Sequence, residues 1–391
     1  MNARTTSLRE SSGQVNETSE LWSLVADTSV LNFMPGIDVA PNFVERYLVR
    51  IRAQIDAHIR RHVVDLQEAS VASSLQVVVA KKESIADGVM HFELRSAAGS
   101  PLPAYTAGSH VDVTLPNGAI RQYSLCNAPA SHASDRYEIA VLLDPEGRGG
   151  SRSAHFELMQ GAEVRISPPR NHFPLTQARH TILLAGGIGV TPILSMAYHL
   201  DKTDASFEMH YCTRSAARTA FIQQIKASKF TSRVAFYHDD SADSGRFDAL
   251  HVLGRPSIDT HLYVCGPNGF MDYAITTARA SGWVEQNIHR EHFAAPPIDQ
   301  SRDGPFTVQI ASTGQTVPVP AGQTVVQALS HHGIEVPVSC EQGICGTCVM
   351  RVLEGIPDHR DAFFGDEQRD GNDRFTPCCS RAKSSILVID F

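Results

Sequence analysis

The cysteines carry the clearest chemical pattern in this sequence of 391 residues, because five of the eight lie between positions 340 and 379. The spacing C-x4-C-x2-C is formed by Cys340, Cys345 and Cys348, and 29 residues separate this group from Cys378. Four thiolates at this spacing are typical of a plant-type [2Fe–2S] cluster. A tight loop with two glycines would bring three of them together, and the fourth would come from a distant strand. We therefore predict that these four cysteines are the metal ligands.

Two other uses of these cysteines are a zinc site and a set of free buried thiols. Zinc sites usually contain paired C-x2-C knuckles, whereas this region has one such pair. Cys379 follows Cys378 directly and is a second candidate for the fourth ligand. Neighbouring strand residues point to opposite faces, so only one of the two can reach the cluster. The spacing favours Cys378.

A glycine-rich segment, LLAGGIGVTPILSMA, indicates a phosphate-binding turn. Gly186, Gly187 and Gly189 lie between an apolar run that ends near Ala185 and a helix that starts near Thr191–Pro192. Proline suits the first turn of a helix, and glycines let backbone N–H groups approach a phosphate at a helix N-terminus. The alternative is an ordinary strand-to-helix turn that binds nothing.

A second loop, VCGPNGFM, places Cys265, Gly266 and Pro267 after another apolar run. In an open parallel sheet, ligands bind beyond the carboxyl ends of the strands. Both glycine loops would then lie at the same edge and face the same ligand. For Cys265 itself, the alternative is a small buried side chain.

Two further segments offer contacts for a bound ligand. In RQYSLCN, Arg121 and Tyr123 alternate to the same face of a strand, so a cation and an aromatic ring could contact one ligand together, with Ser124 beside them. The alternative for Tyr123 is core or cross-strand packing. The segment GRGGSRSAHF offers a phosphate site before an apparent helix, at Gly149, Gly150, Ser151 and Ser153.

The surrounding sequence divides into segments that would position these groups. Residues 75–175 contain six short apolar runs separated by Gly, Pro and Asn turns, which predicts a small antiparallel β-barrel. The predicted strands are Leu75–Ala80, Met90–Leu94, Val111–Leu115, Arg121–Leu125, Tyr137–Leu143 and Glu163–Ser167.

Residues 176–293 alternate between apolar runs and helical stretches, which predicts a parallel α/β sheet. Its predicted strands are Ile182–Ala185, Phe207–Tyr211, Val234–Tyr237 and Leu262–Cys265. Residues 294–305 are rich in proline and charge and form a predicted linker. The last segment, 306–391, would hold a hairpin of Phe306–Ile310 and Thr316–Val319, a helix from Thr324 and a closing strand at Ile386–Ile389.

The first 74 residues form a predicted extension. Residues 1–20 are polar and predicted to be disordered. Residues 43–66 have the period of an amphipathic helix, with five arginines on its polar faces. This helix would dock a partner protein or an anionic surface, or would pack on its own neighbouring domain.

Composition excludes several classes of protein. The chain is 42% apolar and 19% charged, so it can bury real cores. A net charge of −8 argues against a general nucleic-acid binder. Its 28 Arg against 6 Lys favour binding of phosphate or carboxylate groups. The N-terminus has no apolar signal segment, and glycine and proline interrupt the most apolar stretch, so we expect a cytoplasmic protein without a membrane span.

The order of these motifs resembles the family of phthalate dioxygenase reductase and vanillate demethylase reductase. R-x-Y-S, G-x-G-G-S, G-G-I-G-V-T-P, C-G-P-x-G-F-M and C-x4-C-x2-C…C follow one another over residues 75–391. The resemblance implies a multidomain fold: an FMN-binding β-barrel, a parallel α/β NAD domain and a β-grasp [2Fe–2S] ferredoxin domain. It does not cover the helical N-terminal extension, residues 1–74.

The resemblance also implies residue roles. Tyr123 would lie against the isoalloxazine and Ser124 near its N5, and both would hold the flavin with Arg121. Gly150 and Ser151 would bind the flavin phosphate. The NAD groove would be lined by Gly187, Gly189, Thr191 and Pro192, with Cys265 and Gly266 beside the nicotinamide.

HREHF matches the family's H-x-E-x-F, which would place Glu291 and Phe293 near the flavin. The alternative is that this segment is simply the last strand of the NAD domain. Arg214 and Ser215 would lie at the adenine ribose. The family favours NADH, although Arg214 and Arg218 could accept the 2′-phosphate of NADPH.

By this resemblance, the protein is an enzyme that takes a hydride from NADH to FMN and passes single electrons through the cluster. The acceptor would be a separate Rieske-type non-haem iron oxygenase acting on an aromatic compound. Residues 20–66 would add contact area for it. The alternatives are a cytochrome P450 or a reductive dehalogenase as acceptor, and a redox sensor.

Overall fold

The computed structural model describes residues 74–240, 246–257, 259–293, 300–301 and 303–391. The predicted disordered start and amphipathic helix lie outside these residues, as does most of the predicted linker. Ser73–Phe391 forms one compact unit. Its three largest sheets have separate strand sets and divide it into a first region (Leu75–Asn171), a second region (His180–Glu291) and a third region (Phe306–Asp390).

The first region is an antiparallel sheet with the order β5-β4-β8-β1-β2-β7, and β9 pairs with β4. Its strands are β1 Leu75–Ala86, β2 Val89–Ser96, β4 Ser109–Thr114, β5 Ile120–Ser124, β7 Tyr137–Leu142, β8 Glu163–Ile166 and β9 Arg170–Asn171. All six predicted strands are confirmed. The described strands show no ladder between β5 and β7, so barrel closure stays a prediction.

Alternation of side chains explains this sheet. In β1, Val77 and Val79 are fully buried, and in β8 Val164 and Ile166 enter the same core while Glu163 and Arg165 face outward. The period of two places one apolar face inward on every strand. A small pair, β3 Leu102–Pro103 with β6 Ala133–Ser134, and helix α3 Gly150–Phe156 complete the region.

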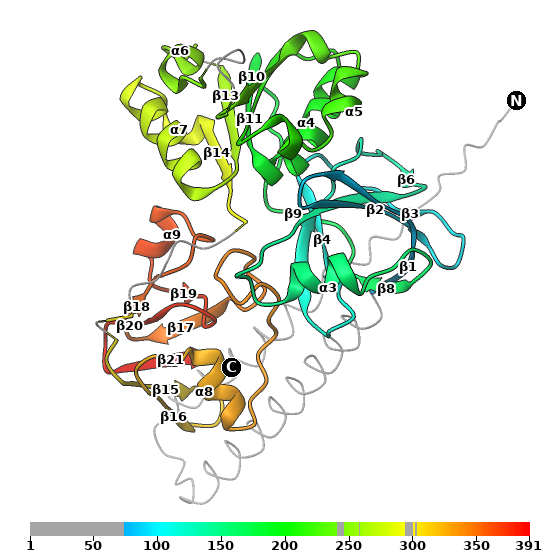
Figure 1. Cartoon of the computed structure of the whole chain (residues 1–391). Coiled ribbons are helices and arrows are strands. Elements are labelled where there is room, and N and C mark those ends of the chain that lie inside the picture. Colours follow the sequence, from blue (N-terminus) through cyan, green and yellow to red (C-terminus); the bar gives the residue numbers. More distant parts are fainter. Residues whose placement is uncertain (1–73, 241–245, 258, 294–299, 302) are drawn as a thin grey trace, which may run out of the picture. The chain divides into compact units, whose positions relative to one another are not determined.

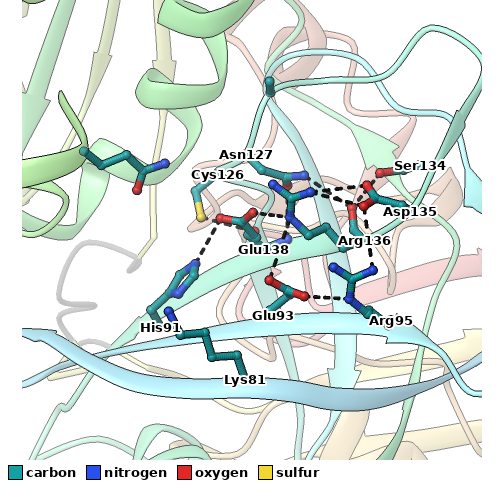
Figure 2. A network of polar contacts seen from close by, with 12 residues as sticks. Lys81, His91, Glu93, Arg95, Cys126, Asn127, Ser134, Asp135, Arg136 and Glu138 are labelled. Carbon is teal, nitrogen blue, oxygen red and sulfur yellow. Dashed lines mark hydrogen bonds and ion pairs between the residues drawn. The ribbon is translucent and has the colours of Figure 1, made fainter. Parts of the chain in front are cut away.

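A polar network ties β2 to β7 on this sheet (Figure 2). Buried Glu138 accepts from Arg136 Nε at 2.6 Å and lies 3.2 Å from His91 Nε2. Burial pushes the pKa of Glu138 upward, but the hydrogen bonds from His91 and Arg136 outweigh it and hold this pKa below its ordinary value. Glu138 is therefore a charged, fully partnered buried carboxylate.

The second region is a wholly parallel sheet with the order β12-β11-β10-β13-β14 (Figure 1). Its strands are β10 His180–Gly186, β11 Phe207–Thr213, β12 Val234–His238, β13 Thr260–Cys265 and β14 Ile288–Glu291. The four predicted strands are confirmed. The fifth strand, β14, corresponds to the alternative interpretation of HREHF as the last strand of this sheet. Glu291 is the last residue of β14.

Helices cover both faces of the parallel sheet. Leu183 and Ala185 of β10 share a core with α4, whereas Ile182 and Leu184 share one with α6 and α7. The α-helices are α4 Val190–Lys202, α5 Ile222–Lys226, α6 Ala249–Leu253 and α7 Asn268–Ala280, and the short 3-10 turns are η2 Gly187–Gly189, η3 Ala216–Arg218, η4 Thr231–Arg233 and η5 Glu285–Asn287. A strand buried on both faces reads as a continuous apolar run, as β10 does.

The third region is a mixed sheet with the order β16-β15-β21-β17-β19. β15 pairs antiparallel with β16 and parallel with β21, which confirms the predicted hairpin and closing strand. Its strands are β15 Phe306–Ile310, β16 Thr316–Val319, β17 Met350–Glu354, β19 Arg374–Phe375 and β21 Ile386–Asp390. A separate two-stranded sheet pairs β18 Pro357–Asp358 with β20 Arg381–Ala382. Helix α8, Val325–His331, begins at a capping box in which Thr324 and Gln327 satisfy each other's backbone N–H groups. A short helix, α9, spans Asp366–Asp370.

None of the helices in the described part of the chain is long and apolar enough to cross a membrane.

Candidate functional site

A cavity of about 1490 Å³, the central cavity, takes its lining from all three regions. Fifteen predicted site residues line it: Arg121, Tyr123, Ser124, Gly150, Ser151, Gly186, Gly187, Thr191, Arg214, Arg218, Gly266, Pro267, Glu291, Phe293 and Cys340. Four other predicted residues of the nucleotide sites are not among its lining: Gly189, Pro192, Ser215 and Cys265. The fold therefore gathers most of the predicted flavin and nucleotide residues around one space.

The two glycine loops meet at the carboxyl ends of β10 and β13, as their positions after parallel strands predict. A Cβ on Gly189 would lie 2.2 Å from the Cys265 carbonyl oxygen, and one on Gly266 would lie 2.8 Å from Gly186 Cα. Only glycine permits this backbone-to-backbone packing. Gly189 thus shapes the cavity edge through the loop contact. Gly187, with φ +52°, faces open space.

Cys265 belongs to the core of the second region. Its side chain is 0% exposed and packs among apolar residues of β10 and α4, and burial raises the pKa of its thiol well above the ordinary value. This is the environment of a small buried side chain, the alternative that the sequence left open. Pro192 is also buried, in the first turn of α4.

Ser124 and Glu291 connect β5 of the first region to β14 of the second. Ser124 Oγ donates to Glu291 Oε2 at 3.4 Å across a sequence separation of 167 residues. Burial raises the pKa of Glu291 to about 8, although the hydrogen bond from Ser124 lowers it. The carboxyl therefore holds its proton near neutral pH and can donate a hydrogen bond into the cavity.

Arg121 and Tyr123 share one face of β5, and both line the cavity. Burial raises the pKa of Tyr123 to about 12, so its hydroxyl keeps its proton. Gly150 gives room to Arg121, because a Cβ there would lie 2.7 Å from Arg121 Nε. A flavin needs donors to its phosphate and contacts to its ring. The arginine and the helix that starts at a glycine suit the phosphate, and the tyrosine and serine suit the ring.

The predicted position of the serines is partly wrong. Gly150, Ser151 and Ser153 lie within the first turn of α3, not before it. Ser151 Oγ accepts from the Asp144 N–H at 3.0 Å, and Ser153 Oγ donates to Glu157 at 2.6 Å. Ser151 still lines the cavity, whereas Ser153 is buried and does not line it.

Sequence reasoning missed His110, which pairs with Ser124 across the β4–β5 ladder. It lines the cavity, and within the described residues neither ring nitrogen has a hydrogen-bond partner. Burial lowers the pKa of His110 to about 3, with smaller contributions from His172 and Arg170, so the ring is neutral. Such orphaned buried nitrogens are expected where a polar ligand completes the site. The sequence does not single it out, because His110 directly precedes the predicted strand Val111–Leu115 and has the polar Ser109 and Asp112 nearby.

The cluster loop, residues 340–348, gathers the predicted metal ligands. Cys340, Cys345, Cys348 and Cys378 are all at most 5% exposed. Cys340 shares hydrogen bonds with Cys345 and Cys378, and the Gln342 N–H donates to its sulfur at 3.3 Å. These contacts hold the pKa of the Cys340 thiol below its ordinary value. Backbone N–H groups aimed at sulfur suit thiolate ligands.

Within the described residues, no three His, Cys, Asp or Glu side chains form a group around a single metal ion. A two-iron cluster makes a different demand, because its four thiolates are divided between two irons. Four buried thiols in mutual reach fit that donor set.

Cys379 hydrogen-bonds to the neighbouring Cys378 thiol, and its other side-chain partners are polar residues of its own segment. Its sulfur lies 3.3 Å from Thr376 Oγ1 and 3.8 Å from Ser380 Oγ. A Cβ on Gly343 would lie 2.3 Å from this sulfur, so Cys379 packs behind the cluster loop. Cys378, in contrast, contacts both Cys340 and Cys348. The geometry favours Cys378 as the fourth ligand.

Comparison with known proteins agrees with this geometry. Residues 308–383 match the family model of the 2Fe-2S iron-sulfur cluster binding domain. Over 317 residues the chain is 50% identical to the vanillate O-demethylase oxidoreductase of Pseudomonas sp. strain HR199, covering 81% of this chain and 99% of that protein.

Two solved structures are similar over the same part of the chain. One is phthalate dioxygenase reductase, described as a modular structure for electron transfer from pyridine nucleotides to [2Fe-2S], at 38% identity and a TM-score of 0.64, covering 82% of this chain and 98% of that one. The other is an intact type IV self-sufficient cytochrome P450 monooxygenase, at 37% identity and a TM-score of 0.71, covering 81% of this chain and 41% of that one.

Proposed function

The chain belongs to the oxidoreductase family of vanillate O-demethylase oxidoreductase and phthalate dioxygenase reductase, and from this premise we propose that it carries electrons from NADH through FMN and a [2Fe–2S] cluster to a separate oxygenase. The observation that carries the proposal is the central cavity, in which the R-x-Y-S strand, both glycine loops and Cys340 of the cluster loop line one space. Such an arrangement brings an electron donor, a carrier and an acceptor within reach of one another.

The residues of the first region would hold the flavin. Arg121 and the start of α3 at Gly150 would bind its phosphate, and Tyr123 and Ser124 would contact its ring, with His110 close by. When bound, the flavin supplies the conversion of a two-electron hydride donor into single electrons. The protein itself needs no nucleophile for this chemistry.

The residues of the second region would orient NADH and control protons. Gly187, Thr191 and Gly266 would line the nucleotide groove. The Glu291 carboxyl, protonated near neutral pH and bonded to Ser124 Oγ, would hold a proton beside the flavin and exclude water from that side. Beyond the end of β11, Arg214 and Arg218 line the cavity together with Asp239.

The choice between NADH and NADPH depends on Arg214, Arg218 and Asp239. An acid near the ribose favours the free 2′-hydroxyl of NAD, and an arginine favours a 2′-phosphate. We propose NADH, in keeping with the family. Turnover with NADPH at equal kcat/KM would instead assign Arg214 and Arg218 to the 2′-phosphate.

The acceptor that we propose is a Rieske-type non-haem iron oxygenase that acts on an aromatic compound. A relative named for vanillate demethylation, 99% covered by this chain, supports it. The second candidate is a cytochrome P450, which the likeness to the self-sufficient P450 favours. Transfer of electrons to purified acceptors of both kinds distinguishes the two.

An anaerobic NADH titration followed by visible absorbance tests the electron path. We expect uptake of roughly three electrons per chain, two by the flavin and one by the cluster, with bleaching of both. Chromatography of the released flavin should identify FMN. Bleaching of the flavin with no bleaching of the cluster would contradict the proposal.

Residues 1–73 of the extension lie outside the described residues, and we propose that the extension adds contact area for the oxygenase. Removal of residues 1–70 should slow oxygenase-coupled turnover and leave reduction of a small dye unchanged. Equal loss of both activities would contradict this role.

A further inference from the structure

We propose that Arg148 is a positioning residue that holds the cluster loop against the flavin side of the central cavity. Its guanidinium makes two contacts with consecutive residues of that loop. Nη1 donates to Glu341 Oε2 at 2.8 Å, and Nη2 donates to the backbone oxygen of Cys340. We call this pair of contacts the clasp; its role in electron transfer rests on the function proposed above.

The clasp starts from the residues expected to bind the flavin. Arg121 Nη2 donates to the Arg148 backbone oxygen at 3.4 Å, and Arg148 directly precedes Gly149 and α3. Gly149 has φ +80°, a left-handed conformation that glycine adopts without cost. After Gly149 the chain enters α3, and before it the Arg148 side chain extends to the cluster loop.

The clasp ends on a metal ligand. Glu341 follows Cys340 and has φ +52°, which is unusual for a residue with a side chain. Backbone strain of this kind persists only where the surroundings hold it. The two Arg148 contacts are cross-region contacts, 192 and 193 residues apart in sequence, that supply such a hold. Arg148 and Cys340 also line the same cavity.

An isolated exposed ion pair stabilises little, and both side chains here are about half exposed, 41% and 51%. The second bond, to a backbone oxygen, fixes the direction of the guanidinium and makes the contact bidentate. Its expected effect is therefore on the distance between the flavin and the cluster more than on the stability of the chain.

The clasp would assist electron transfer from the flavin to the cluster, a step in which no covalent bond forms or breaks. Each transfer oxidises the reduced flavin by one electron and reduces the cluster by one, and NADH supplies the electrons. A cluster loop that spends less time against the cavity receives these electrons more slowly, whereas delivery from NADH to the flavin does not involve Glu341.

The test is a charge swap in the full-length holoprotein, with Glu341→Arg, Arg148→Glu and the double variant. In stopped-flow mixing with NADH, Glu341→Arg should leave flavin bleaching at the wild-type rate and slow cluster bleaching about tenfold, equivalent to about 1.4 kcal/mol. The double variant restores the ion pair but not the bond to the Cys340 backbone oxygen, so it should recover part of this loss. Raised salt should slow cluster bleaching in the wild type and have no such effect in Glu341→Arg.

A second readout needs no turnover. Amide hydrogen exchange of residues 340–346 in the oxidised protein should rise in each single variant and fall again in the double variant. Arg152→Glu on α3 and Glu354→Arg on β17 are matched controls, because both side chains are exposed and make the same charge change away from the clasp. Iron content and absorbance verify that the cluster is present, and Glu341→Gln replaces Glu341→Arg if the latter does not assemble it.

Wild-type rates and exchange in Glu341→Arg or Glu341→Gln would overturn the clasp, as would a double variant as slow as either single variant. Failure of the proposed function looks different, because the wild-type cluster would then not bleach with NADH at all.

Discussion

The four thiols of the cluster site come from two short segments of one region, whereas the central cavity takes its lining from residues between Asp87 and Gln368. The cluster site is a local structure with few parts, each of which is indispensable. The cavity is spread over three regions, and many side chains share its lining. A single substitution at the cluster site should therefore abolish cluster binding, whereas one in the cavity should only weaken ligand binding.

The strongest contrast lies between two neighbouring cysteines. Cys378→Ser removes a thiol that contacts Cys340 and Cys348, so we expect loss of the [2Fe–2S] absorbance and of its iron. Cys379→Ser should retain both, because its sulfur bonds to Thr376 and Ser380 behind the loop. Iron analysis and visible spectra of both variants check this. A cluster that survives Cys378→Ser and is lost in Cys379→Ser would reverse the ligand assignment.

Glycines give the next largest effect. Gly343→Ala places a Cβ at 2.3 Å from Cys379 Sγ and 2.9 Å from Asp361 Cα, at φ +71°. The backbone strain and the overpacking each cost about 1–3 kcal/mol. Gly187→Ala in the cavity has φ +52° but no heavy atom within 4 Å, so about 1–2 kcal/mol is expected.

Thermal unfolding of both variants, followed by cluster absorbance and by flavin fluorescence, measures this difference. Gly343→Ala should lower the temperature of cluster loss by more than Gly187→Ala lowers that of flavin release. Equal shifts would show that the two loops are equally constrained.

The same contrast explains what could be predicted from sequence. Cysteine spacing and strand periodicity are short-range signals, so the sequence could name four candidate ligands and ten of the strands in the first two sheets, and the structure confirms those strands. His110 and the Arg148–Glu341 contact were not, because they depend on the β4–β5 register and on a pairing across 193 residues. Cys265 shows the reverse case: a motif residue whose side chain belongs to the core.

In the cavity, one substitution should weaken flavin binding without abolishing it. Arg121→Gln removes a charged donor to the expected phosphate, and bonds to charged groups contribute about 1.5–3 kcal/mol, or about 10- to 150-fold in Kd. Fluorescence titration of flavin-free protein with FMN measures this change. Arg165→Gln on the outward face of β8 is the control and should have no effect. Complete loss of binding in Arg121→Gln would mean that the cavity also depends on a single residue.

A pH-dependent effect concerns the Glu291 carboxyl, whose raised pKa of about 8 follows from burial without a cation. The folded protein holds this proton and the unfolded chain, with a pKa of about 4.3, does not. The free energy of unfolding should therefore fall by up to about 1.4 kcal/mol per pH unit from about pH 5 to 8. Urea unfolding of wild type and Glu291→Gln across this range isolates the contribution, because the amide cannot ionise.

Glu138 supplies the matched control, because it is also buried but has His91 and Arg136 as partners. Its pKa is lowered, so its contribution is present above the unfolded pKa and is lost as pH falls through the lower, folded value. Wild type and Glu138→Gln should accordingly differ most near neutral pH and converge in acid. The two glutamates thus predict opposite slopes. If Glu291→Gln and wild type keep a constant difference between pH 5 and 8, then Glu291 is ionised in the folded protein and the cavity supplies it with a partner.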